Sequence, residues 1–128
     1  MQYKDFRDLE IWKSSRELRK ALSETIKKVF PGDEKYKLAD QIIRASRSVT
    51  ANIAEGYGRY HYQENIQFCR QARGSLMELI DHLTVARDEE YIDKDVFERL
   101  IVEIKEILKN LNGYIKYLKS RKDDLINQ

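Results

Sequence analysis

The chain has a single cysteine, a single proline and only five glycines in 128 residues. One cysteine excludes an intramolecular disulfide framework and is typical of a reducing compartment. So little proline and glycine disfavours a sheet protein, which needs many turns. No stretch approaches the roughly 20 apolar residues of a membrane-spanning helix, and the first residues lack the apolar core of a signal peptide. We therefore expect a cytoplasmic protein with no membrane partner.

What the chain does contain is apolar residues at helical spacing. Hydrophobic residues make up 41% and charged residues 36% of the sequence. Pro31 and Gly32 stop the first apolar stripe, and Gly56 and Gly58 suit a helix C-terminus because glycine accepts a left-handed conformation. Asp93 is placed to cap a later helix. The four stripes predict helices over residues 8–29, 35–57, 62–90 and 93–121.

The connections between these predicted helices are short, which favours antiparallel neighbours. We therefore predict an all-α protein, with a single domain over residues 1–128 folded as an up-down-up-down antiparallel four-helix bundle. A chain of this length can bury a core without disulfides or metals. A coiled-coil rod is the alternative, and the two interruptions of the apolar pattern argue against it.

Charge is unevenly distributed, although the net charge is only +2. Residues 74–106 carry four basic and ten acidic side chains, whereas residues 41–73 and 107–128 each carry five basic and two acidic ones. In the predicted topology the acidic 88–95 segment lies at one end of the bundle. Acidic residues there also suit a helix N-terminus. The opposite end should gather the basic residues Arg59, Lys116, Lys119, Arg121 and Lys122.

The sequence predicts no catalytic residue, metal site, cofactor or small-molecule substrate. A di-metal centre in a bundle uses two Glu-x-x-His pairs, whereas Glu78 precedes His82 by four residues and His61 lies near a loop. We expect His82 to be solvated on the polar side of its helix. Cys69 lies in an apolar stripe, which predicts a buried, inert thiol rather than a nucleophile.

Other features indicate self-association. Gly74 lies in mid-helix, where glycine costs about 1 kcal/mol relative to alanine, and close approach of another helix would offset that cost. Arg44 and Glu55 are too far apart for a local helix pair, so we expect their partners to come from elsewhere. Solvent exposure is the alternative. Three apolar residues lie off the stripes of their helices and would be buried in an oligomer: Leu9, Val102 and Tyr117.

Arginine and aromatic residues alternate around the predicted turn between the second and third helices. The aromatic residues are Tyr57, Tyr60, His61 and Tyr62. Guanidinium groups pair with phosphates and aromatic rings stack on unpaired bases, so this combination suits RNA. The alternative is that the arginines form salt bridges between subunits. The arginines are Arg44, Arg47, Arg59, Arg70 and Arg73.

Three segments resemble a bacterial family of four-helix bundles named for reading frames in intervening sequences of 23S ribosomal RNA genes. They are residues 3–12, 51–59 and 72–79. The chain departs from the family pattern at Thr50, His61, Tyr62 and Asn65. The resemblance carries over the motif positions Asn52, Glu55, Arg59, Arg73 and Glu78. The small residues of the motifs are candidates for helix packing or an interface: Ala51, Gly56, Gly58 and Gly74.

The resemblance implies a ring-shaped homo-oligomer, typically of five subunits, without enzymatic activity. It also implies a link to ribosomal RNA that is largely one of gene location. Similar bundles act as accessory nucleic-acid binders in retroelement systems. We therefore expect a non-enzymatic, ring-forming bundle that binds RNA through arginine-rich surfaces. The alternative is a purely structural or protein-interaction oligomer with no nucleic-acid role.

Overall fold

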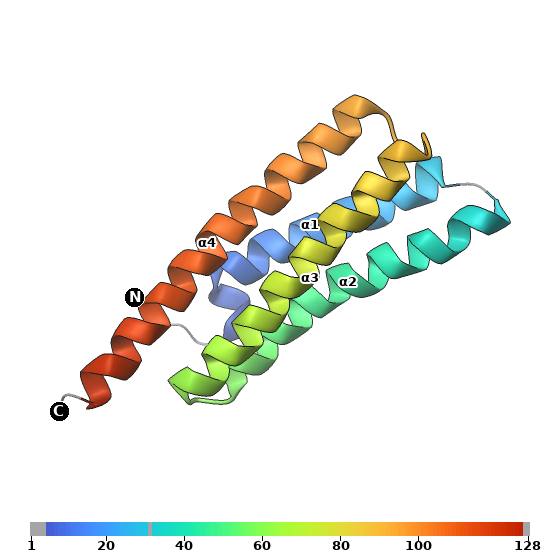
Figure 1. The fold of residues 1–128 in the computed structure, drawn as a ribbon. Helices are drawn as coiled ribbons and strands as arrows, with labels where there is room; N and C mark the ends of the chain where they lie inside the picture. The colour runs from blue at the N-terminus through green and yellow to red at the C-terminus, as the bar shows by residue number, and fades with distance from the viewer. Residues whose placement is uncertain (1–4, 31, 127–128) are drawn as a thin grey trace.

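The computed structural model describes residues 5–30 and 32–126 and contains four long helices (Figure 1). A short 3-10 turn, η1, precedes them. The last helix continues five residues beyond the predicted end at 121, and its apolar stripe ends at Leu118. The elements are η1 (Phe6–Asp8), α1 (Glu10–Val29), α2 (Asp33–Gly58), α3 (Tyr62–Asp88) and α4 (Lys94–Ile126).

Each helix packs on the next in the chain, and α1 also packs on α4 (Figure 1). Within the described ranges, the backbones of the diagonal pairs α1–α3 and α2–α4 do not come close, since none of their Cα atoms lie within 8 Å of each other. This arrangement confirms the predicted all-α, up-down-up-down antiparallel bundle. We call the end that holds the α2–α3 turn and the end of α4 the lower end, at the lower left of Figure 1. The α1–α2 and α3–α4 connections lie at the upper end.

The apolar stripes of the four helices meet in one core along the bundle axis. Cys69 belongs to it and is fully buried, as expected. Leu9 is also buried, at 3% exposure, so its predicted place off the stripe is wrong. Helical spacing does not apply to Leu9 because it precedes α1 with an extended backbone. Core side chains with at most 1% exposure include Leu18, Leu22, Ile42, Ile53, Leu76, Leu79, Leu100, Ile104 and Leu111.

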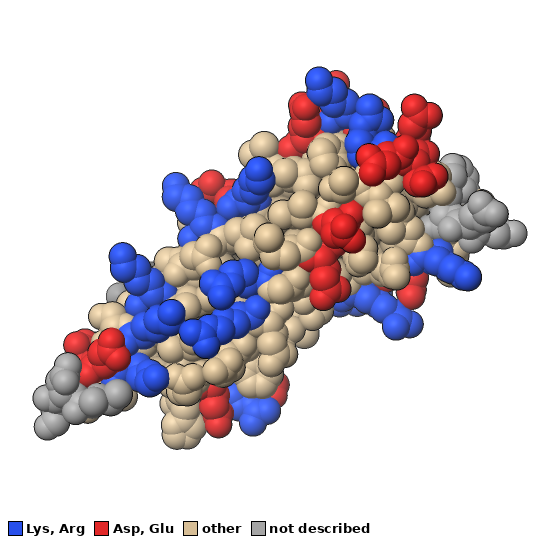
Figure 2. Space-filling model, viewed as in Figure 1, with Lys and Arg blue, Asp and Glu red and all other residues tan. Residues whose placement is uncertain are grey.

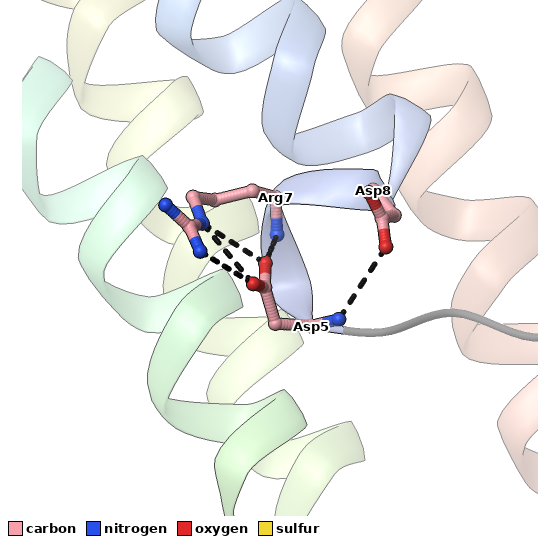
Figure 3. A network of polar contacts seen from close by, with 3 residues as sticks. All are labelled: Asp5, Arg7 and Asp8. Atoms are coloured by element: carbon pink, nitrogen blue, oxygen red, sulfur yellow. Dashed lines mark hydrogen bonds and ion pairs between the residues drawn. The ribbon is translucent and has the colours of Figure 1, made fainter.

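A capped turn sets where α1 begins (Figure 3). The Asp5 carboxylate accepts a hydrogen bond from the backbone N–H of Arg7 at 2.7 Å and faces the Arg7 guanidinium, with Nη2 at 2.7 Å. The Asp8 side chain accepts from the Asp5 N–H in return. The hydrogen bond from Arg7 lowers the pKa of Asp5, so the carboxylate stays charged. Phe6 then packs edge-to-face on Trp12, with ring centroids 5.3 Å apart.

The turn between α2 and α3 depends on a tyrosine, and not on a glycine as predicted. Gly56 and Gly58 both lie inside α2, and of the glycines in the described residues only Gly32 has a positive φ. The left-handed residue is Tyr60, with φ of 61°. The expectation that the two α2 glycines cap the helix in that conformation is therefore wrong.

Close packing against α3 explains Gly56 instead. A Cβ atom on Gly56 would lie 2.7 Å from Asn65 Oδ1, 2.9 Å from Phe68 Cβ and 3.2 Å from the Asn65 carbonyl oxygen. The Asn65 side chain is itself buried and hydrogen-bonds to both Cys69 and Tyr114. It therefore has little freedom to move aside, and only glycine fits here.

Replacing Gly56 with alanine should lower the free energy of unfolding by about 1–3 kcal/mol, because the methyl group overpacks a rigid contact. Gly113 is the matched control, since it lies within α4 and a Cβ there would meet no atom within 4 Å. Gly113→Ala should stabilise the protein by about 0.5–1 kcal/mol. Urea denaturation followed by circular dichroism measures both values. Equal effects of the two substitutions would contradict the packing role of Gly56.

Candidate nucleic-acid interface

Basic side chains gather over the lower half of α3 and α4, whereas acidic ones are more frequent in the upper half (Figure 2). Arg73 marks the middle of this region, because its Nη1 donates to Asn112 Oδ1 of α4 at 2.9 Å. Lys109 and Lys116 lie about one turn to either side of Asn112, and Arg70 lies one turn before Arg73. We call these four residues the basic face: Arg70, Arg73, Lys109 and Lys116.

Three cations at the lower end are held by contacts to the α2–α3 turn. Arg59 pairs with Glu55 at 2.8 Å and lies over the Phe68 ring, 5.2 Å from its centroid. Lys122 Nζ donates to Gln63 Oε1 at 2.6 Å. A hydrogen bond to Tyr62 raises the pKa of Arg121. Lys119 is exposed between Lys116 and Lys122 on α4, so it connects these cations to the basic face.

The structure does not bring Arg44 and Arg47 to this region. Arg44 precedes Arg59 on α2 by about four turns, or roughly 22 Å. Its Nε pairs with Asp40 Oδ2 at 2.9 Å, and Glu55 pairs with Arg59. The expectation that Arg44 and Glu55 need distant partners is therefore wrong, because each has an opposite charge four residues away. Arg47 is exposed on the same helix.

A pocket of about 300 Å³ opens at the lower end, and we call it the tyrosine pocket. It lies below the start of α1, because Lys13 and Ser14 of α1 lie beside Ile107 and Asn110 of the antiparallel α4. The next turns of α4 therefore run past the beginning of α1. Its lining residues are Tyr57, Tyr60, His61, Tyr62, Asn65, Tyr114, Tyr117 and Leu118.

Residues from α3 and α4 are linked around this pocket. Asn65 Nδ2 of α3 donates to the Tyr114 hydroxyl of α4 at 3.3 Å. Tyr114 and Tyr117 stack with centroids 6.2 Å apart. The sequence pattern did not identify Tyr114 as a site residue, and it marked Tyr117 only as an off-stripe apolar residue. Their spacing of three residues near the end of the last helix was the available signal, since it places both rings on one side of α4.

Of the remaining motif positions, Asn52 takes part in a hydrogen-bond network between α2 and α3, and within the described residues the others make no contact that explains them. Asn52 Nδ2 donates to the Ser48 carbonyl at 2.9 Å and to its hydroxyl at 3.0 Å. The Ser48 hydroxyl in turn accepts from Ser75 of α3 at 2.8 Å. Ala51 and Glu78 are exposed. A Cβ on Gly58 or Gly74 would meet no atom within 4 Å, so no contact in this chain explains either glycine.

His82 is half-buried, with 18% of its side chain exposed, so the expectation of a solvated histidine is wrong. It lies in the groove between α2 and α3, where the small residues Ala45 and Ser48 leave room for the ring. The described residues contain no group of three or more His, Cys, Asp or Glu side chains that could hold a metal ion. Burial raises the pKa of Cys69 to about 12, so its thiol stays protonated and unreactive.

None of the described helices combines the length and apolar character needed to cross a bilayer. Among known proteins, a family model described as 23S rRNA-intervening sequence protein matches residues 7–113. A protein of unknown function from Bacteroides thetaiotaomicron VPI-5482, assigned to the S23 ribosomal protein family, has a similar crystal structure. Its TM-score is 0.77 at 24% identity over 83% of this chain and 98% of that one. No curated protein matches the chain.

Burial of Cys69 should make stability fall at alkaline pH. The thiol loses its proton near pH 9 when exposed and near pH 12 in the fold, so unfolding releases a proton between these values. The stability advantage of the wild type over Cys69→Ala should therefore fall by about 1.4 kcal/mol per pH unit in this window. Urea denaturation of both proteins measures the difference. An advantage that is constant with pH would contradict the buried, neutral thiol.

Proposed function

The chain belongs to the 23S rRNA-intervening sequence protein family, and from this premise we propose a non-enzymatic, ring-forming bundle of the cytoplasm that binds RNA through its basic face and lower end. The observation that carries the proposal is the basic face itself. In the part of the chain that the structure describes, Arg70, Lys109 and Lys116 make no ion pair or hydrogen bond, and Arg73 bonds only to a neutral amide. Their charges are therefore available for phosphates.

The arrangement suits a phosphate backbone rather than a small anion. The four cations come from two adjacent helices, and Lys109 and Lys116 lie about 10 Å apart along α4. The cations at the lower end, Arg59, Arg121 and Lys122, continue the same charge toward the tyrosine pocket. A row of exposed cations binds a nucleic-acid backbone by displacing its counterions, so affinity depends strongly on salt.

Removing two of these charges should weaken RNA binding and reduce its salt dependence. For the double variant Arg70→Gln and Lys116→Gln, the slope of log affinity against log salt should be less steep by about 0.7 per lost phosphate contact. Fluorescence anisotropy with a labelled single-stranded RNA of about 15 nucleotides measures the slope.

Two exposed lysines of α1, replaced as Lys20→Gln and Lys28→Gln, make the matched control, because they remove the same charge away from the basic face. This control should keep the wild-type slope. Equal losses in both double variants would mean that only net charge matters. Absence of RNA binding at low salt, with the oligomer intact, would favour the structural or protein-interaction alternative.

Ring formation is supported by an exposed strip on the upper half of α3. Met77 is 56% and Val85 39% exposed, and Gly74 below them has open space around it. A neighbouring subunit packed on this strip would bury the apolar side chains and use the close approach that glycine permits. Each additional subunit would add another basic face, so weak contacts would act together on one RNA.

In solution the protein should have a mass several times the 15.3 kDa of one chain. Met77→Glu should lower that mass, because it places a charge in the strip without disturbing the core of the subunit. Size-exclusion chromatography with light scattering measures both. Leu125→Glu, at a 58% exposed site near the end of α4, is the matched control and should leave the mass unchanged. Dissociation caused by the Leu125 change alone would mean that the interface lies on α4.

A further inference from the structure

We propose that the tyrosine pocket holds one unpaired nucleobase, whose adjoining phosphates contact the cations at its rim. This inference rests on the proposed RNA function for the source of the base. It adds a binding site for one base to a surface that otherwise binds RNA only through charge. The pocket, its rings and its cations each support the proposal.

The pocket is open because α1 begins partway up the bundle and does not reach the lower end. The capped turn at Asp5–Asp8 (Figure 3) precedes α1, whose first turns lie beside the middle of α4. Within the described ranges, no helix therefore covers Tyr114 and Tyr117 from that side. The resulting volume of about 300 Å³ is at the lower limit of pockets that hold small organic molecules. It suits a single planar ring system, and it is too small for a packed helix or a folded segment.

Aromatic rings line the pocket from two directions. One group comes from the end of α2, the turn and the start of α3, and the other comes from α4. The first group is Tyr57, Tyr60, His61 and Tyr62, and the second is Tyr114 and Tyr117. Tyr60 is 89% and Tyr117 55% exposed, so both rings offer a free surface at the mouth of the pocket. Stacking between a base and an aromatic ring is favourable for every base, so this arrangement predicts weak sequence preference.

Polar groups deeper in the pocket can meet the edge of a base. The Tyr114 hydroxyl accepts from Asn65, and within the described ranges it donates to no other group, so its own proton is available. Burial raises the pKa of Tyr114 to about 12, which keeps that proton in place at neutral pH. A ring nitrogen or carbonyl oxygen of a base is a suitable acceptor.

The rim of the pocket carries the charge that a nucleotide needs. Arg121 hydrogen-bonds to Tyr62, a lining residue, and Lys122 is held by Gln63. Arg59 precedes Tyr60 in the chain, and its guanidinium is held by Glu55 and the Phe68 ring. The facing acidic groups are Glu55, already paired with Arg59, and Asp124 near Arg121.

Two other polar grooves of the described surface lack this combination. The groove between α1 and α4 is lined by Glu17, Glu103 and Glu106, which would repel a phosphate. The groove between α2 and α3 contains Glu78, and its Arg44 is paired with Asp40. The tyrosine pocket differs from both grooves because it combines aromatic rings with cations beside its lining, which suits an anionic ligand with a flat apolar ring.

The test compares single-stranded with double-stranded RNA of the same sequence, because only the single strand can place a base in the pocket. Tyr117→Ala should weaken binding of a labelled single strand of about 12 nucleotides by roughly tenfold and leave the duplex affinity unchanged. Tyr117 is exposed, so the variant should fold. Tyr117→Phe keeps the ring and should bind like the wild type. Tyr36→Ala, 75% exposed on α2 near the upper end, is the matched control.

A titration with adenosine monophosphate, followed by NMR, separates a base within RNA from a free nucleotide. If RNA binds but Tyr117→Ala changes single-strand and duplex affinity equally or not at all, the pocket proposal is overturned while the RNA function stands. If the wild type binds the mononucleotide through Tyr117 but no RNA, the base site stands and the RNA function fails. If neither ligand binds, both proposals fail.

Discussion

The close contact between α2 and α3 at Gly56 organises the lower end of the molecule. Because Gly56 has no side chain, the Asn65 carbonyl and the Phe68 Cβ can approach its backbone. Asn65 then extends the contact to a third helix through the Tyr114 hydroxyl. Farther up, the Ser48–Ser75 hydrogen bond continues the same interface. The positions of the turn, the tyrosines and the neighbouring cations all depend on this spacing of two helices.

The different lengths of the helices give this end its chemical character. The turn at η1 begins α1 well above the lower tip of α4 (Figure 1), so within the described residues only three helices continue into the lower end. Rings that would be core residues in a longer bundle line an open pocket instead. Lys109 and Lys116 of α4 lie toward α3, on either side of the Arg73–Asn112 hydrogen bond, whereas Arg121 lies at the pocket beside Tyr62. Together these groups offer both charge and stacking to a single-stranded nucleic acid.

Much of the fold could be predicted because apolar spacing reports directly on helix faces. The site was harder to predict, because its residues come from three helices. Arg59, Arg121 and Lys122 were correctly expected at one end, since topology alone places them there. Arg44 was grouped with them by sequence proximity to the turn, although about four helical turns separate it from Arg59. His61, Tyr62 and Asn65 line the pocket together with Tyr114 and Tyr117 of α4, and this proximity of two distant segments is visible only in three dimensions.

The sequence by itself determined the four helices, their antiparallel order, the inert Cys69 and the separation of acidic and basic ends. These properties depend on local periodicity, short connections and chain direction. Only the tertiary structure decided that Gly56 allows close packing of α2 on α3 and that Tyr60 adopts the left-handed conformation in the turn. It also decided that Leu9 is buried in the core and that α4 extends beyond the start of α1, which leaves a pocket. Those outcomes depend on distances between atoms far apart in the chain, which no spacing along a single helix can specify.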